Sequence, residues 1–160
     1  MKQFNGFENA DNRSLVLLPF SSGTSALPKG VMLSHRNVTS VCEMSDANIP
    51  DEPITLPTTN DFQDVLPCVV PMYHIYGLVI LLISKLSLGC KVVTLPKFSP
   101  KTYLNCITEH KATVLYVAPP LAIFLGNSDL VTSRHLETVR TISTGAAPLG
   151  ILDIERIKEK

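Results

Sequence analysis

A loop rich in hydroxyl side chains separates two apolar segments near the N-terminus. Residues 21–30 read SSGTSALPKG. Hydroxyls and backbone N–H groups of a tight small-residue turn can donate hydrogen bonds to phosphate oxygens, and Lys29 adds a positive charge. The segment is not a Walker A loop, which needs Gly-Lys followed by Ser or Thr. The pattern predicts a nucleotide triphosphate site, with a solvated Ser/Gly/Pro linker as the plain alternative.

Three further segments carry candidate polar residues, and each also fits an ordinary structural role. Residues 71–77 read PMYHIYG, in which His74 taken alone fits a core or capping histidine and Tyr76 a core residue. Lys97, in PKF after an apolar run, fits a solvated strand end. Residues 144–150, TGAAPLG, fit a strand-to-helix turn. Taken singly, these segments identify no function.

Taken together, the segments resemble the adenylate-forming (AMP-binding) superfamily of acyl-CoA synthetases, 4-coumarate–CoA ligases and firefly luciferases. Residues 21–37, SSGTSALPKGVMLSHRN, are similar to that superfamily's phosphate-binding signature SSGTTGxPKGV followed by a His-Arg-Asn helix start. PMYHIYG, PKF with the later VAPP, and TGAAPLG follow in the order that the family has. The four segments span most of the chain, and the branch of 4-coumarate ligases and luciferases is the nearest.

The resemblance implies an ATP-dependent acid–CoA ligase. A small carboxylic acid would react with ATP to give an acyl-adenylate and pyrophosphate, and coenzyme A would then displace AMP. By position, the phosphates would be held by Ser21, Ser22, Gly23, Thr24, Ser25 and Lys29. His74, the catalytic candidate, and Tyr76 would line the acyl-adenylate pocket, and Lys97 would meet the coenzyme A phosphates. Adenine and the acyl group would lie along the backbone of Gly145, Ala146, Ala147 and Pro148.

The sequence also departs from the family pattern. Ala26 stands at a family glycine position, where an L-residue forced to positive φ costs about 1–2 kcal/mol. The family's glutamate for Mg²⁺ and the lysine of its C-terminal domain do not occur before Lys160. We therefore expect residues 1–160 to be a partial N-terminal domain that is inactive by itself. The alternatives are a non-catalytic nucleotide-binding or regulatory module, and a luciferase-like oxygenase.

Short apolar runs alternate with helix-like segments along the chain. The runs at 15–18, 65–70, 91–95, 113–117 and 139–142 are apolar at successive positions, which predicts strands covered on both faces. Helices are predicted at 35–47 after Ser34 as N-cap, at 76–88, at 101–110 and briefly after 119–120. Residues 48–61 predict a long loop. This alternation predicts an α/β fold with layers of sheet and helix.

Composition narrows the class of protein. Fourteen basic and fourteen acidic residues balance to zero, so we expect no nucleic-acid partner. The longest aliphatic run, 78–83, is far shorter than the ~20 residues of a membrane span, and the polar first fourteen residues do not fit a secretory signal. The four cysteines form no CxxC pair, which favours reduced core thiols over a metal site. We expect an intracellular protein, cytoplasmic or peroxisomal.

Overall fold

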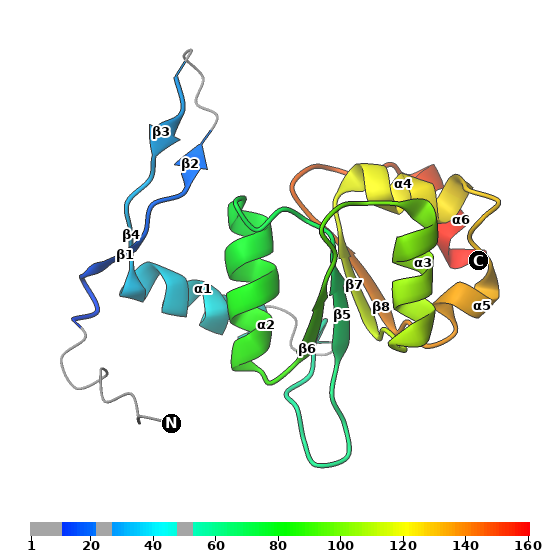
Figure 1. Ribbon diagram of the computed structural model, residues 1–160, viewed down its shortest axis with the longest axis horizontal. Coiled ribbons are helices and arrows are strands. Elements are labelled where there is room, and N and C mark those ends of the chain that lie inside the picture. The colour runs from blue at the N-terminus through cyan, green and yellow to red at the C-terminus, as the bar shows by residue number, and fades with distance from the viewer. Residues whose placement is uncertain (1–10, 22–26, 48–52) are drawn as a thin grey trace.

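The computed structural model describes residues 11–21, 27–47 and 53–160 of the chain. Its centre is a layer of four parallel strands: β5 (Val65–Cys68), β6 (Lys91–Thr94), β7 (Val114–Val117) and β8 (Thr141–Thr144). β5 pairs with β6, and β7 pairs with β8. The two pairs lie side by side in the order β6, β5, β7, β8 (Figure 1), and the Thr113 N–H donates to the Val65 carbonyl at 3.0 Å where they meet.

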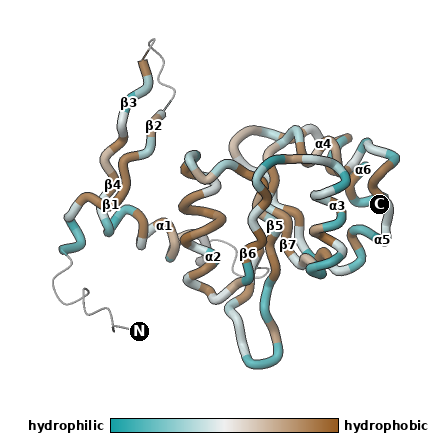
Figure 2. The backbone as a smooth tube through the Cα atoms, in the orientation of Figure 1, coloured by the Kyte–Doolittle hydropathy of each residue, from teal (hydrophilic) through white to brown (hydrophobic). Residues whose placement is uncertain are grey.

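Helices cover both faces of this layer. Leu115 and Val117 of β7 pack with α3 (Pro100–Glu109) and α4 (Pro119–Asn127), whereas Val114 and Tyr116 pack on the other face with η1 (Tyr76–Ile83). Every residue of β7 is buried, as a strand between two helical layers must be. Figure 2 shows hydrophobic residues concentrated along these strands and the helix that faces them. The predicted α/β layered fold is confirmed.

The helices follow the predicted ranges closely. α1 (His35–Ala47) has the predicted bounds, and Ser34 caps it: Ser34 Oγ accepts from the Asn37 N–H at 3.3 Å, and Asn37 Oδ1 accepts from the Ser34 N–H at 2.9 Å. The helix predicted at 76–88 begins as the π-helix η1 and continues as α2 (Ser84–Ser87). α3 and α4 lie where helices were expected, and α5 (Ser133–Leu136) and α6 (Ile151–Lys158) complete the set.

The predicted strand ranges need three corrections. β5 ends at Cys68 rather than at 70, and β8 runs from Thr141 to Thr144 rather than over 139–142. Val139 instead donates its N–H to the Leu136 carbonyl in the turn that precedes β8. The run at 15–18 forms β1 (Leu15–Leu17), but Leu15 and Val16 are exposed, so coverage on both faces was wrong for this strand.

β1 is exposed because it belongs to an arm of short antiparallel pairs. β1 pairs with β4 (Leu33–Ser34), and β2 (Phe20–Ser21) pairs with β3 (Lys29–Gly30). This arm extends away from the strand layer, and α1 connects it to η1 and α2 (Figure 1). The described part of the predicted loop, 53–61, contains no helix or strand. Within the described ranges, no helix is both long and apolar enough to cross a bilayer.

Asp64 forms hydrogen bonds at the amino ends of the four parallel strands. Its side chain is fully buried, and its carboxylate accepts from Thr113 Oγ1 at 2.6 Å, from the Leu56 N–H at 2.7 Å and from Arg140 Nη2 at 3.1 Å. Its backbone carbonyl accepts from the Lys91 N–H at 2.8 Å. Asp64 stands directly before β5, and its partners Lys91, Thr113 and Arg140 stand at or just before the starts of β6, β7 and β8. One residue therefore sets the alignment of all four strands.

Asp64→Asn should lower the free energy of unfolding by about 2–4 kcal/mol, because an amide nitrogen would face donors and Arg140 would lose its counter-charge. The urea unfolding midpoint measures this change. Asp61→Asn, at an exposed position of the same loop, is the matched control and should stay within about 0.5 kcal/mol. Equal losses in both variants would contradict the role of Asp64.

Candidate functional site

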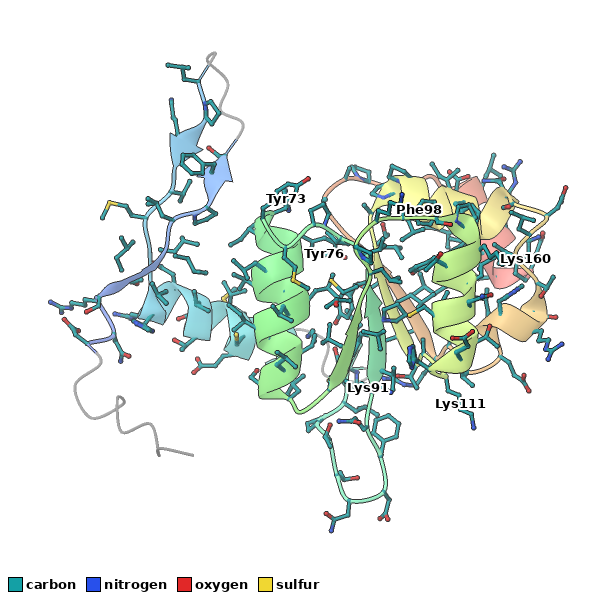
Figure 3. The ribbon with its side chains drawn as sticks, viewed as in Figure 1. Tyr73, Tyr76, Lys91, Phe98, Lys111 and Lys160 are labelled. Carbon is teal, nitrogen blue, oxygen red and sulfur yellow. The ribbon has the colours of Figure 1, made fainter. Side chains whose placement is uncertain are left out.

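All the predicted site segments except the hydroxyl loop, which follows β2 of the arm, come after the carboxyl ends of the four parallel strands. PMYHIYG comes after β5, PKF after β6, APP after β7 and GAAP after β8. Parallel strands place these ends at one edge of the layer, which is where ligands bind in open α/β sheets. Figure 3 shows Tyr73, Tyr76 and Phe98 at this edge, with Lys91 and Lys111 at the opposite edge.

His74 is held by hydrogen bonds around the turn that leads into η1. The backbone N–H of His74 donates to the Pro71 carbonyl at 3.1 Å, and the backbone carbonyl of His74 accepts from the Leu78 N–H at 3.0 Å. Its Nδ1 accepts from the Tyr76 N–H at 3.1 Å. This contact fits the tautomer that carries its proton on Nε2, from which the ring can donate to a ligand.

A pocket of about 450 Å³ brings His74 together with the start of the hydroxyl loop. Its lining residues are Pro19, Phe20, Ser21, Val31, Leu33, Tyr73, His74 and Ile75. Lys29 lies directly across from Ser21 in the β2–β3 pair, so the cation and the hydroxyl stand together at the base of the loop. The other predicted loop residues, Ser22, Gly23, Thr24 and Ser25, lie outside the described residues, as does Ala26.

A second pocket, of about 600 Å³, contains Lys97. Its walls come from the carboxyl ends of β5 and β6 and include Cys68, Met72, Tyr73, Thr94 and Phe98. The Lys97 side chain is exposed. Tyr73 lines both pockets, so the segment 71–75 stands between the one that holds His74 and the one that holds Lys97.

Tyr76 packs against the turn after β8. A Cβ built on Gly145 would lie 3.2 Å from the Tyr76 ring, so the ring rests on the Gly145 backbone. Tyr76 Oη donates to the Val117 carbonyl at 3.4 Å, a long hydrogen bond. Burial, with smaller contributions from Tyr116 and Cys68, raises the pKa of Tyr76 to about 12. The phenol therefore stays protonated and remains a donor at neutral pH.

The turn after β8 contains a strained residue that the sequence did not indicate. Ala146 has φ 71°, in the left-handed region that L-residues avoid. Ala146, Ala147 and Pro148 are exposed, and Gly145 is half-buried beneath Tyr76. Sequence reasoning placed possible strain at Ala26 instead. Nothing in the residue type marks Ala146, because tertiary contacts and not local preference set its conformation.

Gly77 permits the close approach that shapes the His74 turn. A Cβ at this position would lie 2.3 Å from the Pro71 carbonyl oxygen, a separation that real Cβ atoms do not adopt. Gly77 is buried in the first turn of η1, and π-helical turns are frequent at functional sites. Absence of a side chain therefore lets η1 start directly against the backbone that carries His74.

Gly77→Ala should lower the free energy of unfolding by about 1–3 kcal/mol, even though alanine is intrinsically the better helix former. Either the Pro71 backbone or the start of η1 must move, so we expect the His74 turn to shift as well. Thermal unfolding measures the loss. Gly30→Ala is the control, since its Cβ would meet only the Leu18 side chain at 3.4 Å. A Gly77→Ala protein as stable as wild type would show that the close approach is not needed.

Residues 3–160 match the model of the family described as AMP-binding enzyme. This chain belongs to that family. It is 42% identical over 137 residues to 4-coumarate–CoA ligase 1 of Solanum tuberosum, a match that covers 85% of this chain and 24% of that protein. It is also 42% identical over 134 residues to 4-coumarate–CoA ligase 3 of Arabidopsis thaliana, covering 83% and 23%. The chain thus spans about a quarter of the length of these curated relatives.

Solved structures of AMP-binding enzymes share the fold. A red-emitting luciferase from Phrixothrix hirtus superposes with a TM-score of 0.78 at 28% identity, covering 92% of this chain and 27% of the luciferase. ATP-bound MatB from Rhodopseudomonas palustris gives a TM-score of 0.76 at 28% identity, covering 94% and 28%. The resemblance drawn from the four sequence segments is therefore confirmed at the level of the AMP-binding enzyme family.

Proposed function

We propose that this chain supplies part of the active site of an ATP-dependent acid–CoA ligase, an acid–thiol ligase. The observation that carries the proposal is the placement of two pockets on either side of the segment 71–75, one with Ser21 and His74 and one with Lys97. Two pockets at one strand edge suit a reaction with two successive nucleophiles. The 42% identity to 4-coumarate–CoA ligases supports the same reaction class.

The first step would join the acid to AMP. An oxygen of the substrate carboxylate attacks the α-phosphorus of ATP, the bond to the β-phosphate oxygen breaks, and pyrophosphate leaves with the bonding electrons. Fixed donors stabilise the charge that gathers on the phosphates. Ser21 and Lys29 face one another on the β2–β3 pair and would bind these oxygens. His74 lines the same pocket, where its Nε2–H would donate to the acyl-adenylate.

The second step would pass the acyl group to sulfur. The coenzyme A thiol loses its proton and attacks the acyl carbonyl, and AMP leaves with the electrons of the acyl–phosphate bond. Lys97 would bind the phosphates of coenzyme A at the mouth of the second pocket. Cys68 also lines this pocket, but burial raises the pKa of its thiol and keeps it a poor nucleophile at neutral pH. The raised pKa of Cys68 is consistent with coenzyme A supplying the reacting thiol.

Among the described residues, no group of three or more His, Cys, Asp or Glu side chains lies close enough together to hold a metal ion. In an ATP-dependent ligase, Mg²⁺ would be held by one or two carboxylates together with the ATP phosphates, whose charge it would neutralise. The steps above describe what Lys29, Lys97 and His74 would do beside it.

A luciferase-like oxygenase is the second candidate, because a luciferase shares the fold with a TM-score of 0.78. Its identity to this chain is 28%, against 42% for the ligases, which favours the ligase. The complete protein, given ATP, Mg²⁺, coenzyme A and a panel of carboxylic acids, should form an acyl-CoA thioester detectable by mass spectrometry. Light emission or oxygen uptake without a thioester would favour the oxygenase.

Lys29→Ala in the complete protein should lower kcat by on the order of 100-fold for every acid substrate alike, because the phosphates are common to all of them. Acid-dependent exchange of labelled pyrophosphate into ATP measures this step. Lys111→Ala, an exposed lysine at the opposite strand edge, is the control and should retain the exchange rate. A Lys29→Ala protein with wild-type exchange would remove Lys29 from the phosphate site.

Lys97→Ala should affect the two half-reactions unequally. Thioester formation should fall about tenfold through a higher KM for coenzyme A, whereas pyrophosphate release should change little. Lys91→Ala is the matched control, because Lys91 is an exposed lysine that stands at the amino end of the same strand, β6. Equal losses in both half-reactions of Lys97→Ala would contradict the separation of the two pockets.

A further inference from the structure

Three elements meet at the carbonyl oxygen of Val117, at the end of β7. This oxygen accepts from Tyr76 Oη at 3.4 Å and from the Gly145 N–H at 3.2 Å. The Tyr76 side chain lies against Gly145, since an added Cβ there would come within 3.2 Å of two ring carbons and 3.3 Å of the hydroxyl oxygen. The start of η1 and the ends of β7 and β8 are thereby joined through one aromatic side chain.

The residue after Gly145 is held in a conformation that it would not adopt by preference. Ala146 has φ 71°, and among the described residues only Lys111, with φ 51°, is another non-glycine at positive φ. An L-residue in the left-handed region returns to the right-handed or extended region unless its surroundings prevent it. The neighbouring Gly145 is contacted by Tyr76 and donates its N–H to the Val117 carbonyl.

We propose that Tyr76 is a positioning residue that acts through Gly145. Its ring holds the turn 144–148 in the strained conformation that presents the turn's backbone to the acyl-adenylate. This inference rests on the proposed function. It assigns Tyr76 a different task from that of a pocket wall, because the phenol hydroxyl is engaged by Val117 and the ring is engaged by Gly145. If Tyr76 acts in this way, removing its side chain lowers activity only while residue 146 is an alanine strained at positive φ.

The test is a rescue experiment in the complete protein. Tyr76→Ala frees Gly145, so the turn relaxes and kcat/KM for ATP in acid-dependent pyrophosphate exchange should fall about tenfold, or about 1.4 kcal/mol. Tyr76→Phe keeps the ring and should lose far less. Adding Ala146→Gly to Tyr76→Ala removes the strain, because glycine adopts positive φ freely, and should restore most of the loss.

Lys111→Gly is the matched control for the rescue. It relieves the same kind of backbone strain, but Lys111 lies at the opposite strand edge (Figure 3), so it should not restore exchange to Tyr76→Ala. Hydrogen exchange of the Gly145 amide provides a second readout, which should become faster in Tyr76→Ala and return toward wild type with Ala146→Gly. Thermal unfolding identifies a variant that does not fold, and Tyr76→Leu then takes the place of Tyr76→Ala.

Rescue by Ala146→Gly but not by Lys111→Gly supports the proposal. Failure of Ala146→Gly to restore exchange, or equal rescue by Lys111→Gly, overturns it. If the wild-type protein shows no acid-dependent pyrophosphate exchange, the proposed function is refuted instead. Hydrogen exchange of the Gly145 amide then tests the role of Tyr76 by itself. An unchanged hydrogen-exchange rate in Tyr76→Ala overturns that role as well.

Discussion

The alignment of the strand layer depends on one buried carboxylate at its amino edge. Regular backbone hydrogen bonds join β5 to β6 and β7 to β8. Between β5 and β7, the Thr113 N–H just before β7 donates to the carbonyl of Val65 at the start of β5. Asp64 binds the Thr113 hydroxyl, and that same hydroxyl oxygen accepts from the Val65 N–H at 3.0 Å. Arg140, just before β8, donates to the same carboxylate. Its positive charge compensates the negative charge of Asp64, and the contact also ties the start of β8 to the other strands.

Fixing the amino edge leaves the carboxyl edge available for chemistry. Buried hydrogen-bond networks are rigid, and strands anchored at one end deliver the loops at their other end to reproducible positions. This edge brings together residues that are far apart in sequence, such as Tyr76 and Gly145, which lie 69 positions apart. The segment 71–75 stands between the His74 and Lys97 pockets only because β5 is central, with β6 on one side and β7 on the other.

The sequence predicted those features that arise from repeated local signals. Apolar runs bounded by helices predicted β5, β6, β7 and the first half of β8, and Ser34 marked the start of α1. The arm was not predicted, because β2, β3 and β4 are only two residues long and too short to carry a pattern. The apolar run of β1 resembled a buried strand, although among the described residues β1 pairs with β4 alone. The four site segments could be predicted to meet, since carboxyl ends of parallel strands share one edge.

Contacts between segments could not be predicted in this way. The sequence contains Gly77, but only the folded chain reveals that the Pro71 carbonyl occupies the space of its missing side chain. Backbone strain is a similar case. The sequence suggested it at Ala26, which stands at a family glycine position, yet among the described residues positive φ occurs at Ala146 and Lys111, where no residue type signals it. A left-handed alanine persists only when neighbouring contacts hold it in place. If Tyr76 is the positioning residue, those contacts act through Gly145, which lies against Tyr76 and donates to Val117, residues that stand 69 and 28 positions earlier in the chain.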